Sequence, residues 1–564
     1  MSDQGEIGGG ASIKASDLFV RCLEAEGVSH IFGVPGEENA DVMISLMDSS
    51  IDFVLCRHEQ AAAFMADTYG RLTGKPGVCL ATLGPGATNL VTGVADANMD
   101  RAPLVAIIGQ ASTSRLHKES HQNMDAIAMF RPITKWAHSI GNAETIPEVV
   151  RKAFKVATTE KPGATVIELP EDLAKAEVSA RPMPVDITRR PAADHKAVAR
   201  AVDAIVAAKS PLILAGNGTV RKRASQQLRR LAKKSGIGVV NTFMGKGAVS
   251  LEDPHSLYTI GLQGRDHVLA AFERADTVIA VGYDLVEYAP SFWNAKGDKT
   301  IVHIDFEPAE IDVDFTVVVD VVGDIADALW QINELMNERY GDKLPLFDIG
   351  GHAALRAAIW DDLTGQAADT SFPMKPQTVV NQMRAALGPD DIMLSDVGAH
   401  KMWVSRYYQC FEPNTCLIPN GFCSMGFALP GAIGAKIAHP ERRVGFICGD
   451  AGFLMNVQDL ETAVRRKINF VCVILVDGEY GLIKWKQQNQ FDGKHSDLAF
   501  TNPDFDLLAK SFGMWGKHLD GPGQLADALE EAFQQTGPAL IAVPVDYSEN
   551  IKLTQRLGNL EAAI

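Results

Sequence analysis

The sequence lacks the features that mark several classes of protein. Lysine and arginine together number 53 against 70 aspartates and glutamates, which leaves a formal net charge of −17 at pH 7 over 564 residues. A chain with this surplus of negative charge is poorly suited to the phosphate backbone, so we expect no nucleic-acid partner. No stretch of about 18 uninterrupted apolar residues occurs, so we also expect no membrane span.

Cysteine pairs and export signals are missing as well. The eight cysteines contain no CxxC pair, and several lie within apolar runs, where a thiol acts as a small hydrophobic group. The first ten residues, MSDQGEIGGG, lack a basic segment followed by an apolar one, so we expect no export signal. Together these absences predict a reduced, cytoplasmic protein.

What is present is the composition and pattern of a folded α/β chain. Hydrophobic residues make up 46% and charged residues 22% of the sequence, as in ordinary globular proteins. Short β-rich runs alternate with helical patterns from end to end, which is typical of parallel sheets. Two stretches rich in proline, glycine or charge, 181–193 and 340–351, interrupt the alternation and predict linkers. The expected fold class is α/β, with three doubly wound parallel-sheet domains at residues 1–180, 190–345 and 370–564.

The third predicted domain carries two aspartates at strand ends. A buried-strand run, 444–448, ends in Gly449-Asp450-Ala451, and the next strand, 470–476, ends in Asp477. Because the carboxyl ends of parallel strands form the ligand-binding edge of an open sheet, both carboxylates can face one crevice. Mg²⁺ commonly takes one or two carboxylates plus the phosphates of a ligand. Gly-Asp and Asp-Gly also close ordinary turns, so the pattern alone permits either interpretation.

The first predicted domain holds a second group of candidates. Glu59 stands at the start of a helix, where the helix dipole favours a carboxylate. The stretch 84–89, GPGATN, follows a strand and opens another helix, which offers free backbone N–H groups or simply a tight turn. His121 and Gln122 lie in a polar loop that either contacts a substrate or is only solvated.

Further motifs run in order through all three domains: RHEQAAAFMADTYGRLTGKPG (57–77), GPGATNL (84–90), HQNMDAIAMFRPITKW (121–136), VGYDLVEYAPSFWN (281–294), DVGAHKMW (396–403), MGFALPGAIGA (425–435) and PVDYSENI (544–551). With the two aspartate motifs, they resemble thiamine-diphosphate-dependent enzymes. Within that family the chain is most similar to acetolactate synthases of the catabolic, flavin-independent kind.

The resemblance implies a first domain that binds the cofactor's pyrimidine, a middle domain, and a third domain that binds its diphosphate with Mg²⁺. Glu59 matches the glutamate that bonds the pyrimidine N1′. Asp450, Asp477 and the carbonyl of Glu479 match the metal ligands. The other residues that the resemblance assigns are His121, Gln122 and Phe130 on the substrate side, and His400, Cys423, Met425, Gly449, Ala451 and Tyr480 in contact with the cofactor.

The implied reaction decarboxylates pyruvate and adds the two-carbon unit to a second 2-oxo acid, giving 2-acetolactate. The implied assembly is a homodimer or homotetramer whose active sites lie between subunits. Two other interpretations stay open: a different 2-oxo acid decarboxylase or lyase of the same family, and a non-catalytic regulatory paralogue. The presence of Glu59, Asp450 and Asp477 favours an active enzyme.

The sequence departs from the family pattern at a few positions. Ala451 replaces a glycine and Val476 replaces the first asparagine of a pair, but Asp477 retains the metal role, so we expect the cofactor to bind. Trp485 occurs in the flavin-containing relatives, where it favours 2-ketobutyrate as acceptor, so either pyruvate or 2-ketobutyrate fits. Lys484 beside it is a substrate candidate or part of a solvated helix face.

The middle domain shows only part of a dinucleotide fingerprint. Gly216-Asn217-Gly218 follows a predicted strand, but no acidic residue follows at the distance that the complete motif has. We therefore expect no bound FAD.

Overall fold

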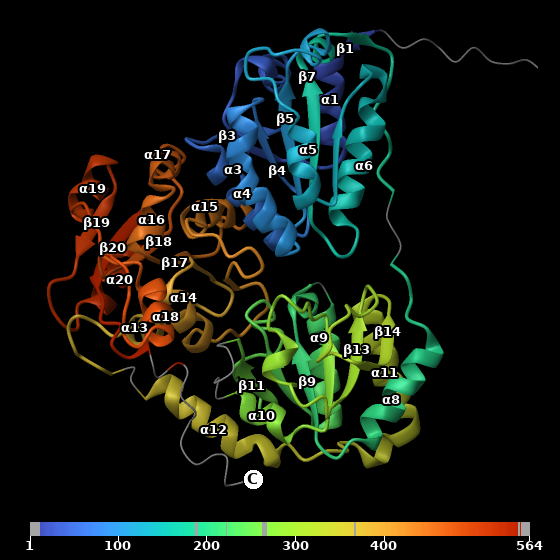
Figure 1. Cartoon of the computed structure of the whole chain (residues 1–564), viewed down its shortest axis with the longest axis vertical. Helices are drawn as coiled ribbons and strands as arrows, with labels where there is room; N and C mark the ends of the chain where they lie inside the picture. The colour runs from blue at the N-terminus through green and yellow to red at the C-terminus, as the bar shows by residue number, and fades with distance from the viewer. Residues whose placement is uncertain are drawn as a thin grey trace, which may run out of the picture. The chain divides into compact units, whose positions relative to one another are not determined.

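The computed structural model describes residues 12–186, 190–221, 223–261, 268–365, 368–550 and 553. These residues form three six-stranded sheets, each with all of its strands parallel, and one antiparallel pair, β1 (Ile13–Lys14) with β8 (Glu177–Val178). Helices accompany each sheet (Figure 1). The predicted class, α/β with three doubly wound parallel-sheet domains, is confirmed, while the exact domain boundaries stay a prediction.

The chain folds into two compact units. One comprises Met1–Thr188 with Ile433–Ala438, and the other comprises Arg189–Ala432 with His439–Ile564. The first unit contains the first sheet, and the second unit contains the other two sheets. None of the helices in the described part of the chain combines the length and apolarity needed to cross a bilayer.

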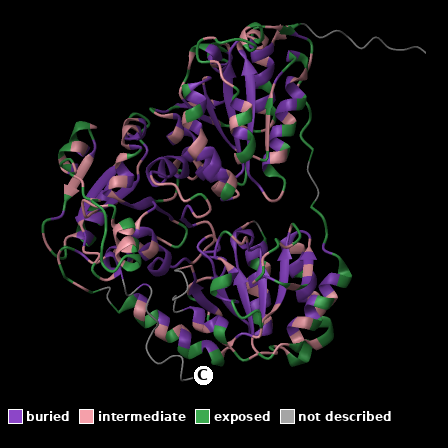
Figure 2. Cartoon of the chain, in the orientation of Figure 1, coloured by how far each residue is buried: buried purple, intermediate pink, exposed green. Residues whose placement is uncertain are grey.

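The first sheet follows the order 2-1-3-4-6-5 when its strands are numbered along the chain. In sheet order these strands are β3 (Asp52–Leu55), β2 (His30–Gly33), β4 (Gly77–Ala81), β5 (Leu104–Gln110), β7 (Ala164–Pro170) and β6 (Trp136–Ser139). Every residue of β4, β5 and β7 is buried, as expected for a parallel sheet covered on both faces (Figure 2). Its helices are α1 (Ala15–Ala25), α2 (Ala40–Leu46), α3 (Glu59–Thr73), α4 (Pro85–Met99), α5 (Ala126–Phe130), α6 (Ile146–Thr158) and α7 (Glu171–Ala174).

The middle sheet has a different strand order, 3-2-1-4-5-6. In sheet order it contains β11 (Ser256–Thr259), β10 (Gly238–Asn241), β9 (Pro211–Ala215), β12 (Thr277–Val281), β13 (Thr300–Asp305) and β14 (Val317–Val322). The direction in which successive strands are added to the sheet reverses between β9 and β12, and this switch point is where open sheets of this order commonly bind ligands. The helices of this domain are α8 (His195–Ala207), α9 (Ala224–Ser235), α10 (Leu269–Arg274) and α11 (Ile325–Tyr340).

The third sheet repeats the order of the first, 2-1-3-4-6-5. In sheet order it contains β16 (Cys416–Leu417), β15 (Ile392–Ser395), β17 (Val444–Gly449), β18 (Val471–Val476), β20 (Ala539–Pro544) and β19 (Trp515–His518). Its switch point lies between β15 and β17. The helices from the middle domain onward are α12 (Gly350–Thr364), α13 (Pro376–Ala386), α14 (Ala399–Tyr407), α15 (Ala428–Ala438), α16 (Asp450–Leu454), α17 (Leu460–Arg465), α18 (Gly481–Gln490), α19 (Phe505–Ser511) and α20 (Leu525–Phe533).

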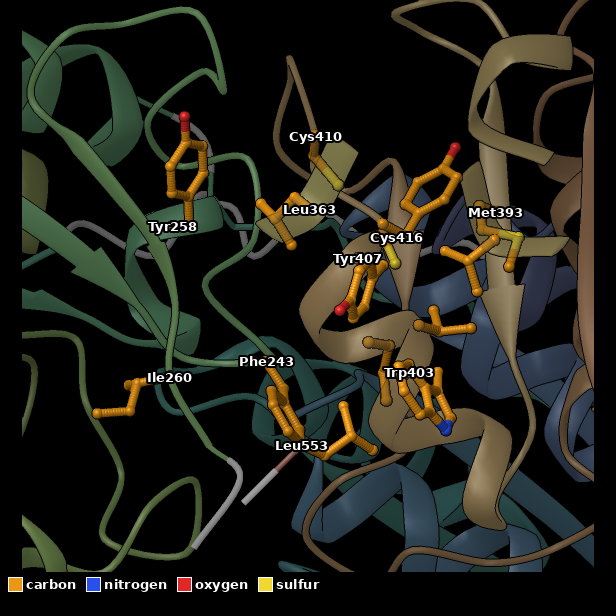
Figure 3. Close-up of a cluster of buried hydrophobic side chains, with 14 of the residues drawn as sticks. Phe243, Tyr258, Ile260, Leu363, Met393, Trp403, Tyr407, Cys410, Cys416 and Leu553 are labelled. Carbon is orange, nitrogen blue, oxygen red and sulfur yellow. The ribbon is translucent and has the colours of Figure 1, made fainter. Parts of the chain in front are cut away.

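The middle and third domains share one hydrophobic core. Phe243 and Tyr258 of the middle domain belong to the same buried cluster as Trp403 and Tyr407 of α14 (Figure 3). A polar contact supports this packing, because the buried Lys246 Nζ donates to the backbone oxygen of Ser405 at 2.7 Å. The third-domain loops are therefore anchored by the middle domain.

In the first unit, a buried ionic cluster joins α3 to α4. Arg71 Nε lies 2.8 Å from Asp67 Oδ1, and Arg71 Nη2 lies 2.6 Å from Asp100 Oδ2 and 3.7 Å from Asp96 Oδ2. The Arg71 side chain is only 7% exposed. Because these helices begin at Glu59 and at the GPGATNL stretch, the cluster fixes two of the predicted site motifs relative to each other.

Replacing Arg71 by alanine should destabilise the first unit by about 3–5 kcal/mol, since three carboxylates lose a buried partner. Urea unfolding followed by circular dichroism measures the shift. Lys510→Ala, which removes the exposed i,i+4 partner of Asp506, is the control and should change stability by less than about 0.5 kcal/mol. Equal effects of the two substitutions would contradict the assigned role of Arg71.

Candidate active site

A cleft of about 200 Å³ lies at the carboxyl edge of the third sheet. Loops that follow β15, β17 and β18 line it, at the switch point where parallel sheets receive ligands. The structure brings together there the predicted cofactor and metal residues of this domain: His400, Cys423, Met425, Gly449, Asp450, Ala451, Asp477, Glu479 and Tyr480. Val397, Ile483 and Tyr547 add apolar and aromatic surface.

Strand register explains why the two aspartates meet. Gly449 of β17 pairs with Leu475 of β18, so Asp450 and Asp477 leave the sheet at nearly the same level. Asp450 is almost completely buried, and its Oδ2 accepts bonds from the backbone N–H of Asp477 at 3.2 Å and of Gly478 at 2.9 Å. The carboxylate of one strand end thus fixes the loop that carries the other.

The proximity of these carboxylates changes the acidity of Asp477. Burial, and next the negative charge of Asp450, raise the Asp477 pKa to about 7. No ion pair neutralises either group within the described ranges, and those ranges contain no cluster of three or more His, Cys, Asp or Glu side chains that could hold a metal ion. A divalent cation here would have two carboxylates and would complete its shell with carbonyl, water or phosphate oxygens, which suits Mg²⁺.

Glycines form part of the cleft wall. A Cβ on Gly481 would lie 2.7 Å from Asp477 Oδ2, and one on Gly449 would lie 3.3 Å from His400 Nδ1. Side chains at these positions would fill the space beside the aspartates. A phosphate group can therefore approach the backbone closely.

His400 presents an unsatisfied polar atom to this region. The side chain is buried and lines the cleft, and its Nε2 has no hydrogen-bond partner in the part of the chain that the structure describes. Burial lowers the His400 pKa to about 3, so the ring is neutral at pH 7, and because its one N–H bonds the backbone of Asp396, Nε2 is left as a hydrogen-bond acceptor. An unpartnered buried acceptor of this kind fits a ligand that supplies a donor.

A loop carrying Cys423 and Met425 forms another wall. Asp396, at the end of β15, accepts the backbone N–H groups of Val397 at 2.6 Å and Gly426 at 2.9 Å, and so anchors this loop. Burial raises the Asp396 pKa to about 6. The Cys423 thiol lies 2.9 Å from the Nζ of buried Lys401, and Cys423 has a φ of 62°, in the left-handed region.

The sequence did not single out three supporting residues in this domain. These are Asp396, Lys401 and Asn502, whose Nδ2 donates to Asp450 Oδ2 at 2.7 Å. Asp396 carries the same signal as the predicted ligands, an aspartate at a strand end, and was recognisable on that ground. Asn502 lies 52 positions from Asp450 and had no such signal.

The first unit holds the other candidates. Glu59 is the first residue of α3 and is buried, and Asn89 Nδ2 of α4 donates to its Oε2 at 2.9 Å. Oε1 has no hydrogen-bond partner within the described residues, and a Cβ on Gly86 would lie 3.4 Å from it. The structure thus brings Glu59 and the GPGATNL motif into contact and leaves one carboxylate oxygen available.

The substrate-side candidates of the first unit differ in exposure. His121 and Gln122 are exposed, and Gln122 has a φ of 57°. Gly84 packs closely on this loop, since a Cβ there would lie 2.7 Å from the Gln122 carbonyl oxygen. Phe130 at the end of α5 is fully buried, so it packs inside the unit rather than on its surface. The catalytic roles of these residues stay predictions.

The two candidates on α18 do not line the cleft of the third domain. Lys484 Nζ lies 2.8 and 2.5 Å from the two carboxylate oxygens of Glu479 and is held by that ion pair. Trp485 is partly buried, and its Nε1 has no partner among the residues with a described placement. Their substrate roles also stay predictions.

Comparisons with known proteins cover nearly the whole chain. Three family models match: the thiamine pyrophosphate enzyme N-terminal TPP binding domain at residues 13–129, the central domain at 198–332 and the C-terminal TPP binding domain at 396–543. An acetolactate synthase of Bacillus subtilis is 36% identical over 544 residues, 96% of this chain and 94% of that protein. A catabolic acetolactate synthase of Raoultella terrigena is 36% identical over 550 residues, covering 96% and 97%. The large subunit of acetolactate synthase isozyme 2 of Escherichia coli is 31% identical over 541 residues, covering 96% and 97%.

Magnesium binding at the third-domain cleft should weaken as the pH falls below about 7. Asp477 holds a proton below its raised pKa, and that proton must leave before the cation binds. Calorimetric titration of the apoprotein with Mg²⁺ at pH 6, 7 and 8, in buffers of different ionisation enthalpy, measures both affinity and proton release. Asp477→Asn should bind weakly with no proton release, and full release in that variant would contradict the assignment.

Cys423 should be the cysteine that reacts in the native protein. All eight cysteines lie in the described part of the chain, and Cys423 is the one that is not buried. Iodoacetamide labelling followed by peptide mass analysis should find one modified site, and thiamine diphosphate with Mg²⁺ should slow its modification. Cys423→Ser should remove the labelling. An unchanged rate in the presence of the cofactor would place Cys423 outside the cofactor site.

Proposed function

The chain belongs to the thiamine-diphosphate-dependent enzymes, and on that premise we propose that it is an acetolactate synthase, which decarboxylates pyruvate and joins the two-carbon unit to a second 2-oxo acid to give 2-acetolactate. This conclusion rests on the sequence identity of 31–36% to acetolactate synthases, which extends over 96% of the chain. The convergence of Asp450, Asp477 and His400 on one cleft supports it.

The third-domain cleft is proposed to hold the diphosphate end of the cofactor. Asp450 and Asp477 bind Mg²⁺ together with the Glu479 carbonyl, because the cation offsets the burial and the repulsion from Asp450 that raise the Asp477 pKa. Neutral His400 offers its Nε2 as an acceptor to a protonated group of the bound ligand, and the glycines of the cleft leave room for phosphate oxygens. When bound, thiamine diphosphate supplies the electron sink for decarboxylation, which no side chain provides.

Glu59 is proposed to act on the pyrimidine end. Asn89 holds Oε2 in place, so the remaining oxygen, Oε1, can accept or hold a proton at a ring nitrogen. Its buried position strengthens this hydrogen bond by excluding water. We place His121, Gln122 and Phe130 on the substrate side, where the exposed His121 and Gln122 orient the 2-oxo acid and the buried Phe130 supports their loop.

The acceptor is proposed to be selected near α18. Trp485 offers an apolar surface and a free indole N–H, while Lys484 acts through the Glu479 carboxylate that it binds. We propose pyruvate as the main acceptor. Mg²⁺ is the proposed metal, and FAD is not required.

Incubating the purified protein with pyruvate, Mg²⁺ and thiamine diphosphate should yield 2-acetolactate, identified by mass, from a colourless preparation. Carbon dioxide released without acetolactate would indicate a different 2-oxo acid decarboxylase. Absence of any turnover would indicate a non-catalytic paralogue.

Glu59→Gln should lower the rate of proton exchange at the cofactor's thiazolium C2 by about 10²–10⁴-fold while the fold is retained. Exchange followed by NMR in deuterated buffer measures this rate. Glu26→Gln is the matched control, since Glu26 is also a glutamate of the first unit, with a side chain 6% exposed and paired with Arg151. Wild-type exchange in Glu59→Gln would remove Glu59 from the proposed role.

We further propose a homodimer or homotetramer whose active sites combine the Glu59 domain of one copy with the Asp450 domain of another. Mixing inactive Glu59→Gln and Asp450→Asn proteins, with subunit exchange, should restore activity. In a mixed dimer, one of the two active sites then combines the intact Glu59 of one copy with the intact Asp450 of the other. Sites built within single chains would stay inactive in every mixture.

A further inference from the structure

The switch point of the middle sheet is a second place where strand-end loops converge. Ala215 of β9 pairs with Val281 of β12 and with Asn241 of β10, so three loops leave the sheet at one level. Gly216 N donates to the Val281 carbonyl at 2.9 Å and Gly218 N to the Gly282 carbonyl at 2.7 Å. Sheets with this strand order receive the phosphates of nucleotides at such a position.

The close approach of these loops requires glycine. Gly282 has a φ of +54°, and a Cβ on it would lie 2.5 Å from the Gly218 Cα. A Cβ on Gly216 would lie 2.8 Å from an oxygen of Glu287. The Gly216-Asn217-Gly218 fragment therefore lies against the Glu287 carboxylate rather than against open space.

Backbone and hydroxyl donors, of the kind that also bind phosphate, hold the Glu287 carboxyl group. Its Oε1 accepts the backbone N–H of Asn217 at 3.0 Å and of Asp284 at 2.9 Å, and its Oε2 accepts the Thr242 hydroxyl at 2.5 Å. These donors come from the loops after β9, β12 and β10, respectively. Glu287 is 7% exposed.

No cation shares this carboxylate in the part of the chain that the structure describes. Glu287 forms no ion pair with a lysine, arginine or histidine there, and its partners are neutral backbone and hydroxyl donors. Burial and the charge of Asp284 raise the Glu287 pKa to about 8. The donors thus offset a substantial cost of burying this group.

We propose that Glu287 is a specificity-determining residue: a tethered carboxyl group that occupies the phosphate position of the middle-domain switch point and closes it to phosphate-bearing ligands. Nucleotide cofactors need the backbone donors of Asn217 and Asp284, and Glu287 already uses them. The middle sheet keeps the topology of a nucleotide-binding fold, and one side chain prevents that use.

Removing the carboxylate should open the site to inorganic phosphate. The holoenzyme, with thiamine diphosphate and Mg²⁺ filling the other cleft, is compared as wild type and Glu287→Ala by thermal unfolding in rising phosphate, with chloride at matched ionic strength. We expect Glu287→Ala to unfold several degrees lower and to regain stability saturably, at a phosphate concentration at least tenfold below any that affects the wild type.

Two further variants make the test decisive. Asp276→Ala removes a carboxylate that also accepts two backbone N–H groups, from Lys209 and Ser210, but at the opposite edge of the same sheet, and it should show no phosphate response. Glu287→Ser keeps a small polar group beside these donors if the alanine variant does not fold, and because it also vacates the position of the carboxyl group, it should respond to phosphate as well. A folded Glu287 variant without a phosphate response, or an equal response in Asp276→Ala, would overturn the proposal.

Discussion

Repulsion between a buried and a half-buried carboxylate is the constraint on which the third-domain site depends. Asp450 and Asp477 are brought to the ends of adjacent strands by sheet register, and Asp450 is almost completely buried there. The free-energy cost of this arrangement is expressed in the raised pKa of Asp477. A protein that keeps such a pair gains from a cation that binds there, and the surrounding glycines make room for the anion that accompanies it.

The three sheets handle carboxylates at their ligand edges in different ways. Glu287 in the middle sheet is satisfied by the protein's own backbone and hydroxyl donors. Glu59 in the first unit receives one amide donor and keeps one oxygen available. Asp477 lacks a neutralising charge within the described residues. A carboxylate whose hydrogen bonds come from the protein leaves no role for a ligand. A buried polar group without a partner favours ligand binding, because it is costly until a ligand supplies the partner.

Much of this protein was predictable before the structure was known. Alternating strand and helix patterns predicted parallel α/β sheets, since a strand buried on both faces needs a continuous apolar run. The strand-end aspartates predicted a cleft. Asn502 and Lys401 were not predictable, because their contacts with Asp450 and Cys423 join residues distant in sequence. The ion pair between Lys484 and Glu479 was likewise not predictable from the pattern of charges along the helix.

The sequence by itself determined the periodicity, the turn residues and the chemical types placed at strand ends, because these depend on neighbours along the chain. Only the tertiary structure decided which of those groups is neutralised by the fold. Glu287 and Asp477 look alike in the sequence, each an acid in a loop after a strand. Strand order and register bring three donor loops to Glu287, whereas they bring a second carboxylate to Asp477, and that difference in surroundings makes one a closed position and the other a site for a cation.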